Sequence, residues 1–298
     1  MFKRERNLEH SREKTMSTRE INCIETLLDV IQSVASDYPE RQLFFRGQKK
    51  LFPTVTPSIG RDNYLRDEDK LFREYVLRNP DEFVGERTTF EKLVKMQHYR
   101  LPTRLLDIST NPLVALFFAV EQDSQFDAED GDFIVFAVPE GKVKYYDSDT
   151  VSAVANVARR PVDRLDIGSM KWEGGESKMT WIERFNKHED VQYLLHEIKD
   201  EKPYFKDIID KEHLESIWCV RPLLKNRRIV KQDGAFLLFG INGTKRELAN
   251  YKDFMPLHFS VKEKKPLRDT LELLGVSKDK LYPELDTTAD YLKTRYGK

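Results

Sequence analysis

The sequence predicts a single α+β domain with helices packed around a β-sheet core. Segments with helical spacing of apolar residues are interspersed with short aliphatic and aromatic runs, which are typical of buried strands. The 298-residue chain has no internal repeat and no low-complexity linker that would divide it. Its hydrophobic content of 39% is sufficient for a substantial core, so disulfides are not needed for stability.

Most elements follow from the spacing of apolar residues. Repeats three and four apart indicate helices, and short apolar runs bounded by Gly or Pro indicate strands. The predicted helices lie at residues 21–36, 65–79, 83–97, 112–119, 148–160, 179–200, 267–275 and 283–296. The predicted strands lie at residues 41–48, 132–138, 142–147, 216–222, 235–239 and 250–262. The second and third of these strands are expected to form a hairpin through Pro139-Glu140-Gly141.

The segment QHYRLPTRLLDISTNPLVALFFA, residues 97–119, joins the densest polar chemistry of the chain to its most apolar helix. Pro112 suits the first turn of that helix, and one of the polar residues 109–111 is expected to cap it. Apolar residues on every side of 112–119 predict a helix that is buried all round. A polar segment held at the start of a core helix is a rigid place for a site.

Charge and cysteine content narrow the class of protein. Lys and Arg total 50 and Asp and Glu total 51, so no overall field points to nucleic acid or to a membrane. Cys23 and Cys219 cannot form a disulfide framework and fit a reducing, cytoplasmic compartment. Residues 1–20 are highly charged and predict a flexible N-terminal segment, without the apolar core of a signal peptide, ahead of a domain at 21–298. No apolar run reaches the roughly 20 residues of a membrane helix.

Arg46 lies inside an apolar strand, between Phe45 and Gly47. An unpaired buried guanidinium would be destabilising by roughly several kcal/mol. Arg46 must therefore either pair with an interior carboxylate such as Asp107 or line a cleft that admits an anion. Gly47 beside it would let a ligand approach the backbone closely.

Other polar residues have both a structural and a chemical interpretation. Arg104 and Asp107 are three apart and could pair with each other as scaffold. His98 follows a predicted helix and is either a structural hydrogen bonder or a base. Gln232 and Asp233 precede a strand, where they could reach into a cleft, although Asp-Gly also makes a turn by itself.

The sequence predicts no metal site and no common nucleotide-binding motif. None of the six histidines is paired at ligand spacing beside acids. The motifs GxxxxGK[ST], GxGxxG and HExxH are absent, which disfavours the P-loop, Rossmann and zincin classes.

The clearest basic cluster is either a solvated face or a contact for a phosphate backbone. It comprises Arg221, Lys225, Arg227, Arg228 and Lys231.

Four segments resemble the FRG domain family, which is named for its Phe-Arg-Gly motif. They are FFRGQ at 44–48, QHYRLPTRLLDISTNPLVALFFA at 97–119, QDGAFLLFG at 232–240 and LLGVSKDKLYPELDTTADYL at 273–292. The segments follow the order of the family and span nearly the whole chain. Two positions depart from the family pattern, because Arg100 stands where Gly is expected and Ile108 where Trp is expected.

The FRG family occurs mainly in bacteria and phages, often near toxin–antitoxin or phage-defence loci. Its motif layout is similar to that of ADP-ribosyltransferases, which implies a split β-sheet core with peripheral helices, NAD as a substrate, and no metal. The resemblance implies catalytic roles for Arg46, His98, Asp107, Gln232 and Asp233. It implies cofactor binding by Arg46, Gly47, Gln48, Tyr99, Thr103, Arg104, Ser109 and Asn111.

The roles that the resemblance implies are chemically coherent. Arg46 would hold the NAD pyrophosphate or the nicotinamide ribose, since a planar guanidinium suits phosphate oxygens. Asp107 or Asp233 would stabilise the oxocarbenium-like ribose that forms as nicotinamide leaves. Many such enzymes have Glu on the late strand, where this chain has Gln232 and Asp233. His98 would orient a ribose hydroxyl or deprotonate the acceptor.

Three functions follow as hypotheses. The first is an NAD-dependent ADP-ribosyltransferase that acts as an intracellular toxin or phage-defence effector on a macromolecular acceptor, with an antitoxin protein as a second partner. The basic cluster slightly favours nucleic acid over protein as the acceptor. The second is a non-catalytic module that senses a nucleotide or binds a protein. The third, a nuclease, is disfavoured because no tight Asp/Glu cluster for Mg²⁺ stands out.

Overall fold

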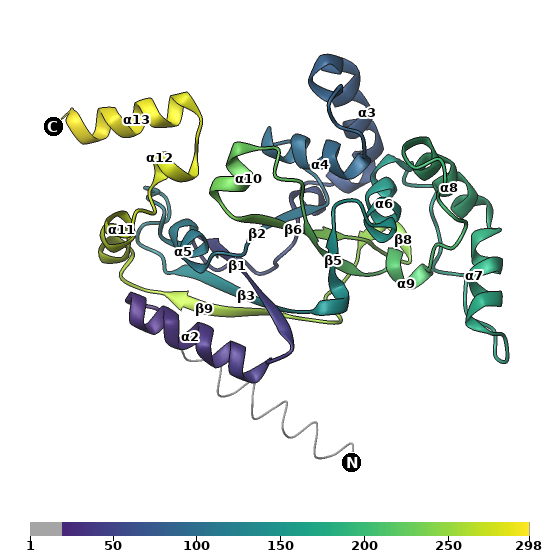
Figure 1. The fold of residues 1–298 in the computed structure, drawn as a ribbon, viewed down its shortest axis with the longest axis horizontal. Helices are drawn as coiled ribbons and strands as arrows, with labels where there is room; N and C mark the ends of the chain where they lie inside the picture. The colour runs from purple at the N-terminus through teal and green to yellow at the C-terminus, as the bar shows by residue number, and fades with distance from the viewer. Residues whose placement is uncertain (1–19, 298) are drawn as a thin grey trace, which may run out of the picture.

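The computed structural model describes residues 20–297. The N-terminal segment predicted to be flexible, residues 1–20, therefore lies outside the described residues apart from Glu20. The predicted α+β class is confirmed. Within the described part of the chain, seven strands form one mixed sheet in the order β4-β5-β6-β2-β1-β3-β9 (Figure 1). These strands are β1 (Arg41–Gln48), β2 (Leu105–Ser109), β3 (Gly131–Pro139), β4 (Val143–Tyr145), β5 (Ile217–Arg221), β6 (Gly234–Phe239) and β9 (Pro256–Val261).

Helices surround this sheet, and a small hairpin stands apart from it. The longer helices are α2 (Ile24–Asp37), α3 (Glu68–Arg78), α4 (Thr89–His98), α5 (Pro112–Val120), α6 (Asp149–Asn156), α7 (Lys178–Asn186), α8 (Glu189–Glu201), α11 (Lys264–Leu273) and α13 (Leu285–Tyr296). The short ones are α9 (Lys211–Leu214), α10 (Arg227–Lys231) and α12 (Lys278–Leu281). Strands β7 (Ile241–Asn242) and β8 (Thr244–Leu248) form the hairpin. None of the described helices has the length and apolar character to span a membrane.

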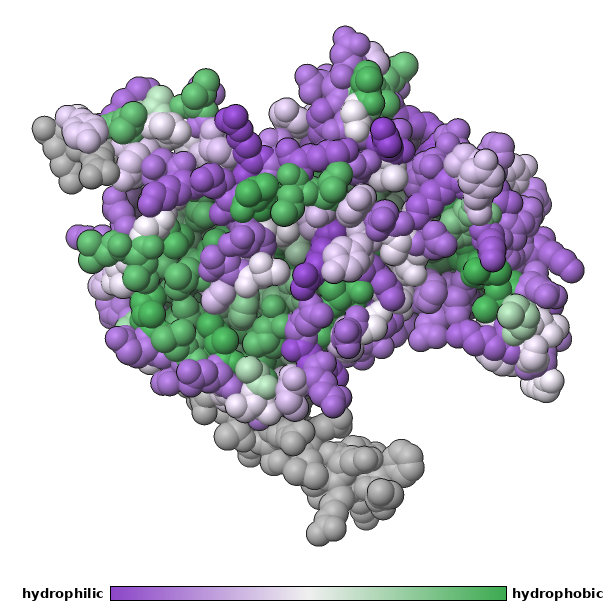
Figure 2. Space-filling model, in the orientation of Figure 1, coloured by the Kyte–Doolittle hydropathy of each residue, from purple (hydrophilic) through white to green (hydrophobic). Residues whose placement is uncertain are grey.

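The two faces of the sheet are covered differently. One face buries a continuous core from β3 across β1, β2 and β6 to β5, and the loops around Val55 and Phe254 cover it. On the other face, α2, α5 and α11 cover β1, β3 and β9, whereas α3, α4, α6 and α8 cover β2, β5 and β6. Figure 2 shows apolar side chains gathered over the α5 side of this face. A seam between two helical layers therefore follows the junction of β1 and β2.

The β1–β2 junction also has very little main-chain pairing. Strand β1 pairs with β3 along its whole length, from Arg41 to Gln48, but it pairs with β2 only at Phe45 and Ser109. The two small sheets expected from the resemblance are therefore one sheet, joined by a single residue pair. A ladder of one pair leaves the neighbouring backbone groups without main-chain partners across the junction, and other groups must satisfy them.

The caps at the ends of the helices explain one correct helix prediction and two that need correction. Asn111 caps α5, because its side-chain oxygen accepts a hydrogen bond from Leu113 N at 3.0 Å, and Pro112 occupies the first turn as predicted. The helix predicted at 83–97 begins only at Thr89, since Thr88 and Glu91 form a capping box there. The helix predicted at 179–200 is two helices, with His188 capping the second.

One pairing prediction was wrong. Residues 132–138 and 143–145 are strands but do not form a hairpin with each other, because the chain makes a 3-10 turn at Glu140–Lys142. Strand β4 instead pairs in parallel with β5, with Val143 opposite Cys219. The β7–β8 hairpin was not predicted, although Gly243 adopts the positive φ of 74° that such a turn requires.

Candidate functional site

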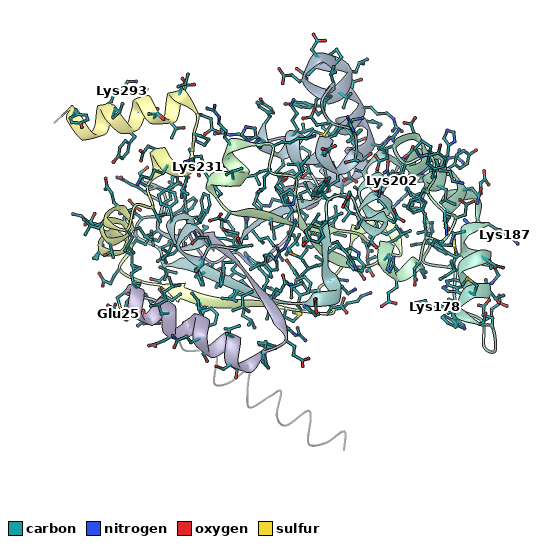
Figure 3. All side chains as sticks on the ribbon, in the orientation of Figure 1. Glu25, Lys178, Lys187, Lys202, Lys231 and Lys293 are labelled. Atoms are coloured by element: carbon teal, nitrogen blue, oxygen red, sulfur yellow. The ribbon has the colours of Figure 1, made fainter. Side chains whose placement is uncertain are left out.

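A cavity of about 250 Å³ opens at the seam, where β1 and β2 diverge. It lies between α5 and α10, on which Figure 3 labels Lys231. We call it the seam cavity. Its lining consists of Phe45, Arg46, Gly47, Asp107, Ile108, Ser109, Ala115, Phe118, Arg228, Gln232 and Tyr282.

Two further spaces adjoin the seam cavity. A pocket of about 70 Å³ shares Asp107, Arg228 and Gln232 with it. This pocket shares His98 and Ile229 with a groove of about 240 Å³ between α4 and α10, which we call the α4 groove. The three spaces therefore form a run of adjoining hollows along one side of β2.

At the junction of β1 and β2, side chains supply hydrogen bonds to carbonyl groups of β2 that main-chain pairing does not supply. Arg46 Nη1 donates to the carbonyl oxygen of Asp107 at 2.7 Å, and Gln97 Nε2 donates to that of Leu105 at 3.1 Å. Gln97 Nε2 also donates to Asp107 Oδ2 at 2.9 Å, while Thr103 donates its hydroxyl hydrogen to Gln97 Oε1. Gln97 thus orients the Asp107 carboxylate, a role that its position at the end of a helix in the 97–119 segment could have suggested.

Arg46 carries an uncompensated charge. Its Nε is buried without a hydrogen-bond partner, and among the described residues no carboxylate lies within ion-pair distance of its guanidinium. Burial lowers the pKa of Arg46, and Asp107 and Tyr251 only partly oppose that effect. Of the two alternatives from the sequence, a cleft that admits an anion fits this geometry, because Asp107 contributes its carbonyl oxygen and no ion pair.

Arg228 is the second cation of the cavity, and the sequence placed it only in a basic cluster. Its guanidinium stacks 4.8 Å above the Tyr282 ring, and no ion pair to it occurs within the described chain. Gln232 lines the cavity and donates from Nε2 to the carbonyl oxygen of Leu281 at 3.1 Å. Burial raises the pKa of the Tyr282 phenol above its ordinary range, so the ring stays neutral. Tyr282 was not predicted as a site residue.

Arg104, which the resemblance implied as a cofactor-binding residue, does not line the cavity, and it pairs with Glu68 and not with Asp107, the alternative partner from the sequence. Its guanidinium is fully buried and donates from Nε to Glu68 Oε1 at 2.9 Å and from Nη1 to the Phe239 carbonyl at 2.8 Å. Lys245 lies 3.5 Å from the same carboxylate. Arg104 is therefore scaffold, because Glu68, which is 36 residues earlier in the chain, takes the role expected of Asp107.

The turn between β2 and α5 is tied to the turn before β6. Ser109 Oγ lines the cavity and donates to the Gln232 carbonyl at 2.7 Å. Asn111 Nδ2 donates to Asp233 Oδ2 at 3.1 Å, and Thr110 N donates to the Asp233 carbonyl at 2.9 Å. Asp233 is exposed and does not line the cavity, so its carboxylate holds the turn together.

His98 and Tyr99 line the α4 groove and not the seam cavity. The pKa of His98 is lowered by burial and by the nearby Arg228, which favours the neutral imidazole. Its ring makes an edge contact with Tyr99, with 4.9 Å between the centroids. His98 also lines the small pocket together with Asp107.

Two residues of the Phe-Arg-Gly segment serve packing. A Cβ on Gly47 would lie 1.8 Å from Ala115 O of α5, so the glycine allows close helix approach, while Gly47 also lines the seam cavity. Gln48 donates from Nε2 to the buried carboxylate of Asp132 at 3.3 Å, and Asp132 also contacts His258 Nδ1 at 3.0 Å. Gln48 is therefore outside the cavity lining.

The basic cluster is dispersed. Arg228 turns into the cavity, Lys225 pairs with Glu91 at 2.7 Å, and Arg221 donates to Gln42 at 2.9 Å. Arg227 and Lys231 remain exposed on α10. The described residues contain no group of three or more His, Cys, Asp or Glu side chains suited to a metal ion.

Arg100, at the position where the family pattern has Gly, adopts a left-handed backbone with φ of 67°. A residue with a Cβ is destabilised there by about 1 kcal/mol relative to Gly. We expect Arg100→Gly to raise the free energy of unfolding by about 0.5 kcal/mol or slightly more, measured by urea denaturation. Lys92→Gly in the middle of α4 should lower it by about 1 kcal/mol. A loss of stability in both variants would contradict the conformational explanation.

Comparison with known proteins finds one family match, which covers part of the chain. Residues 41–128 match the family model of the FRG domain. This range includes β1, β2 and α5, and with them Arg46, Gly47 and Asp107, whereas Arg228, Gln232 and Tyr282 lie beyond it. The comparisons with curated proteins and with solved structures each found no match.

Proposed function

The chain carries an FRG domain at residues 41–128, and we propose that its seam cavity binds NAD for transfer of ADP-ribose to a macromolecular acceptor. The observation that carries this proposal concerns Arg46, which lines an open cavity and whose guanidinium forms no ion pair with a carboxylate of the described residues. A buried cation of this kind favours an anionic ligand. Phosphate oxygens match the planar donors of arginine.

The surroundings of Arg46 support a dinucleotide over a simple anion. The seam cavity, the small pocket and the α4 groove adjoin one another, so a long ligand could extend from Arg46 past Asp107 toward His98. The groove is walled by apolar side chains including Phe90 and Ile229, which suit an aromatic base. The split-sheet layout of ADP-ribosyltransferases is also consistent with the single-pair junction of β1 and β2.

Asp107 is the carboxylate best placed for the chemistry. The bond between ribose C1′ and the nicotinamide nitrogen would break with both electrons going to nicotinamide, which leaves an oxocarbenium-like ribose. The Asp107 carboxylate, oriented by Gln97, would stabilise that cation. An acceptor lone pair would then form the new bond at C1′, and neutral His98 would take the proton that the acceptor loses.

The acceptor and the biological role are part of the same proposal. Arg227 and Lys231 are exposed on α10 beside the cavity mouth, and neither forms an ion pair within the described residues. They would attract a polyanion such as RNA or DNA. We propose that this activity belongs to an intracellular toxin or phage-defence effector that an antitoxin protein restrains, as the resemblance to the FRG family implies.

We expect the purified protein to transfer label from NAD to RNA, DNA or protein of a cell extract. Arg46→Gln and Asp107→Asn should each reduce transfer by roughly 100-fold or more, because each removes a charge that acts on the transition state. Arg66→Gln, an exposed arginine away from the cavity, is the matched control and should keep full activity. Transfer that persists in Arg46→Gln would refute the assignment of the site.

A non-catalytic nucleotide-binding module is the second candidate. One observation favours it. Just before β6, the chain has Gln232 where many transferases have a carboxylate, and the neighbouring Asp233 carboxylate accepts a hydrogen bond from Asn111. In that case NAD or a related nucleotide should bind in an Arg46-dependent manner, and prolonged incubation should release no nicotinamide.

A further inference from the structure

We infer that Arg228 and Arg46 form a two-guanidinium clamp for a diphosphate, and that Tyr282 is the positioning residue that holds Arg228. Both arginines line the same cavity of about 250 Å³, and they come from elements far apart in the chain, α10 and β1. The inference rests on the proposed function only for the identity of the ligand as NAD. The recognition of a diphosphate depends on the two arginines alone.

The pairing state of the cavity arginines sets them apart from scaffold arginines. Arg104, Arg160 and Arg184 each have a carboxylate within 4 Å, as do several others. Arg46 and Arg228 have none within the described part of the chain, although both are partly or largely withdrawn from water. Because both arginines line one cavity and neither has a carboxylate partner, a ligand with two negative charges could pair with both.

The charges of the cavity match one ligand class. Asp107 is the only carboxylate among the described residues that line it. A diphosphate diester has two negative charges, one for each guanidinium, and each phosphate can accept two hydrogen bonds from a planar arginine. The Asp107 carboxylate then remains available for a positive group of the same ligand, such as the pyridinium ring of NAD or the oxocarbenium-like ribose that remains when nicotinamide leaves. A single phosphate group offers fewer acceptor oxygens to two arginines than a diphosphate does.

Tyr282 gives Arg228 a fixed direction without occupying its donors. The ring lies 4.8 Å below the guanidinium, within the range of a cation–π contact, so the N–H groups of Arg228 stay free for a ligand. The ring itself is held by an edge contact with Phe118, with 6.1 Å between centroids. The preceding residue, Leu281, is held by Gln232. The C-terminal segment thus completes the cavity that the FRG segment begins.

The test is calorimetric titration of the full chain with ADP-ribose, AMP, pyrophosphate and phosphate. The wild type should bind ADP-ribose and pyrophosphate more tightly than AMP and phosphate. Arg228→Gln should weaken ADP-ribose binding by about 10- to 100-fold, the range for loss of a charge-assisted partner, and should affect AMP less. Arg66→Gln, an exposed arginine outside the cavity lining, is the control for general surface charge and should bind as the wild type does.

Tyr282 variants separate positioning from general stability. Tyr282→Phe keeps the ring and should bind ADP-ribose within about threefold of the wild type, whereas Tyr282→Leu should lose as much affinity as Arg228→Gln. Thermal unfolding of each variant shows whether it is folded. The clamp is refuted if Arg228→Gln binds ADP-ribose normally, if Arg66→Gln loses as much affinity, or if the wild type binds neither diphosphate.

The outcome for the clamp is distinguishable from the outcome for the transferase. ADP-ribose binding that depends on Arg228, with no turnover of NAD, would support the clamp and refute the proposed activity. NAD turnover that depends on Arg46, with an unchanged KM and kcat in Arg228→Gln, would support the activity and refute the clamp.

Discussion

Glu68→Gln is expected to lower the free energy of unfolding by about 3–5 kcal/mol, because it removes the carboxylate that contacts two buried cations, Arg104 and Lys245. Arg104 and Lys245 are both 0% exposed, and Glu68 is 3% exposed. Arg104 donates to both carboxylate oxygens, and Lys245 lies 3.5 Å from one of them. The amide of Gln can accept a hydrogen bond but cannot balance either charge. Urea denaturation followed by circular dichroism measures the change.

The pH dependence gives this prediction a second readout. Burial would raise the pKa of Glu68, but Arg104 and Lys245 outweigh it and hold the pKa below its ordinary value. A lowered carboxyl pKa contributes stability that is complete above the ordinary pKa of 4.5 and is lost as the pH falls through the folded-state pKa. The difference between wild type and Glu68→Gln should therefore shrink in acid.

An exposed ion pair supplies the control. Glu74 accepts from Arg78 at 2.9 Å, but the two side chains are 56% and 75% exposed. Glu74→Gln should change the free energy of unfolding by no more than about 0.5 kcal/mol. Equal losses in the two variants, or a Glu68→Gln protein as stable as the wild type, would show that Arg104 does not depend on its carboxylate.

Gly47→Ala is the second large effect, with an expected loss of about 3 kcal/mol or more. The added Cβ would lie 1.8 Å from Ala115 O and 2.5 Å from Ala119 N, both backbone atoms of α5. Helix α5 must therefore move away from β1, which opens gaps on its other buried faces. Because Ala115 and Phe118 also line the seam cavity, ligand binding should weaken together with stability.

Two further variants test this explanation. Gly85→Ala adds the same methyl group where no atom lies within 4 Å, so it should leave stability unchanged within about 0.5 kcal/mol. Ala115→Gly combined with Gly47→Ala should not restore stability, since the collision is with the backbone of α5 and not with the Ala115 side chain. Restoration by Ala115→Gly, or a stable Gly47→Ala protein, would contradict the close packing of α5 on β1.

The contrast between Arg46 and Arg104 shows that the ion-pair partner of a buried arginine could not be predicted from the sequence. Both are arginines beside apolar strand residues, and both had Asp107 as a candidate partner in the sequence. Residue spacing cannot separate them, because the partner that decides the matter, Glu68, belongs to a different helix. Arg228 and Tyr282 were missed for the same reason, since their approach to Arg46 requires the whole sheet to be assembled.

The sequence by itself determined the α+β class, the strand that bears Arg46, and the capped, buried helix α5, because these depend on local spacing and on residues adjacent in the chain. Only the tertiary structure decided that β1 and β2 join at a single pair, that Arg104 is neutralised by Glu68, and that Arg228 faces the same cavity as Arg46. The physical reason is that charge compensation depends on which groups meet in space, and here the partners meet only after the seven strands have assembled into one sheet.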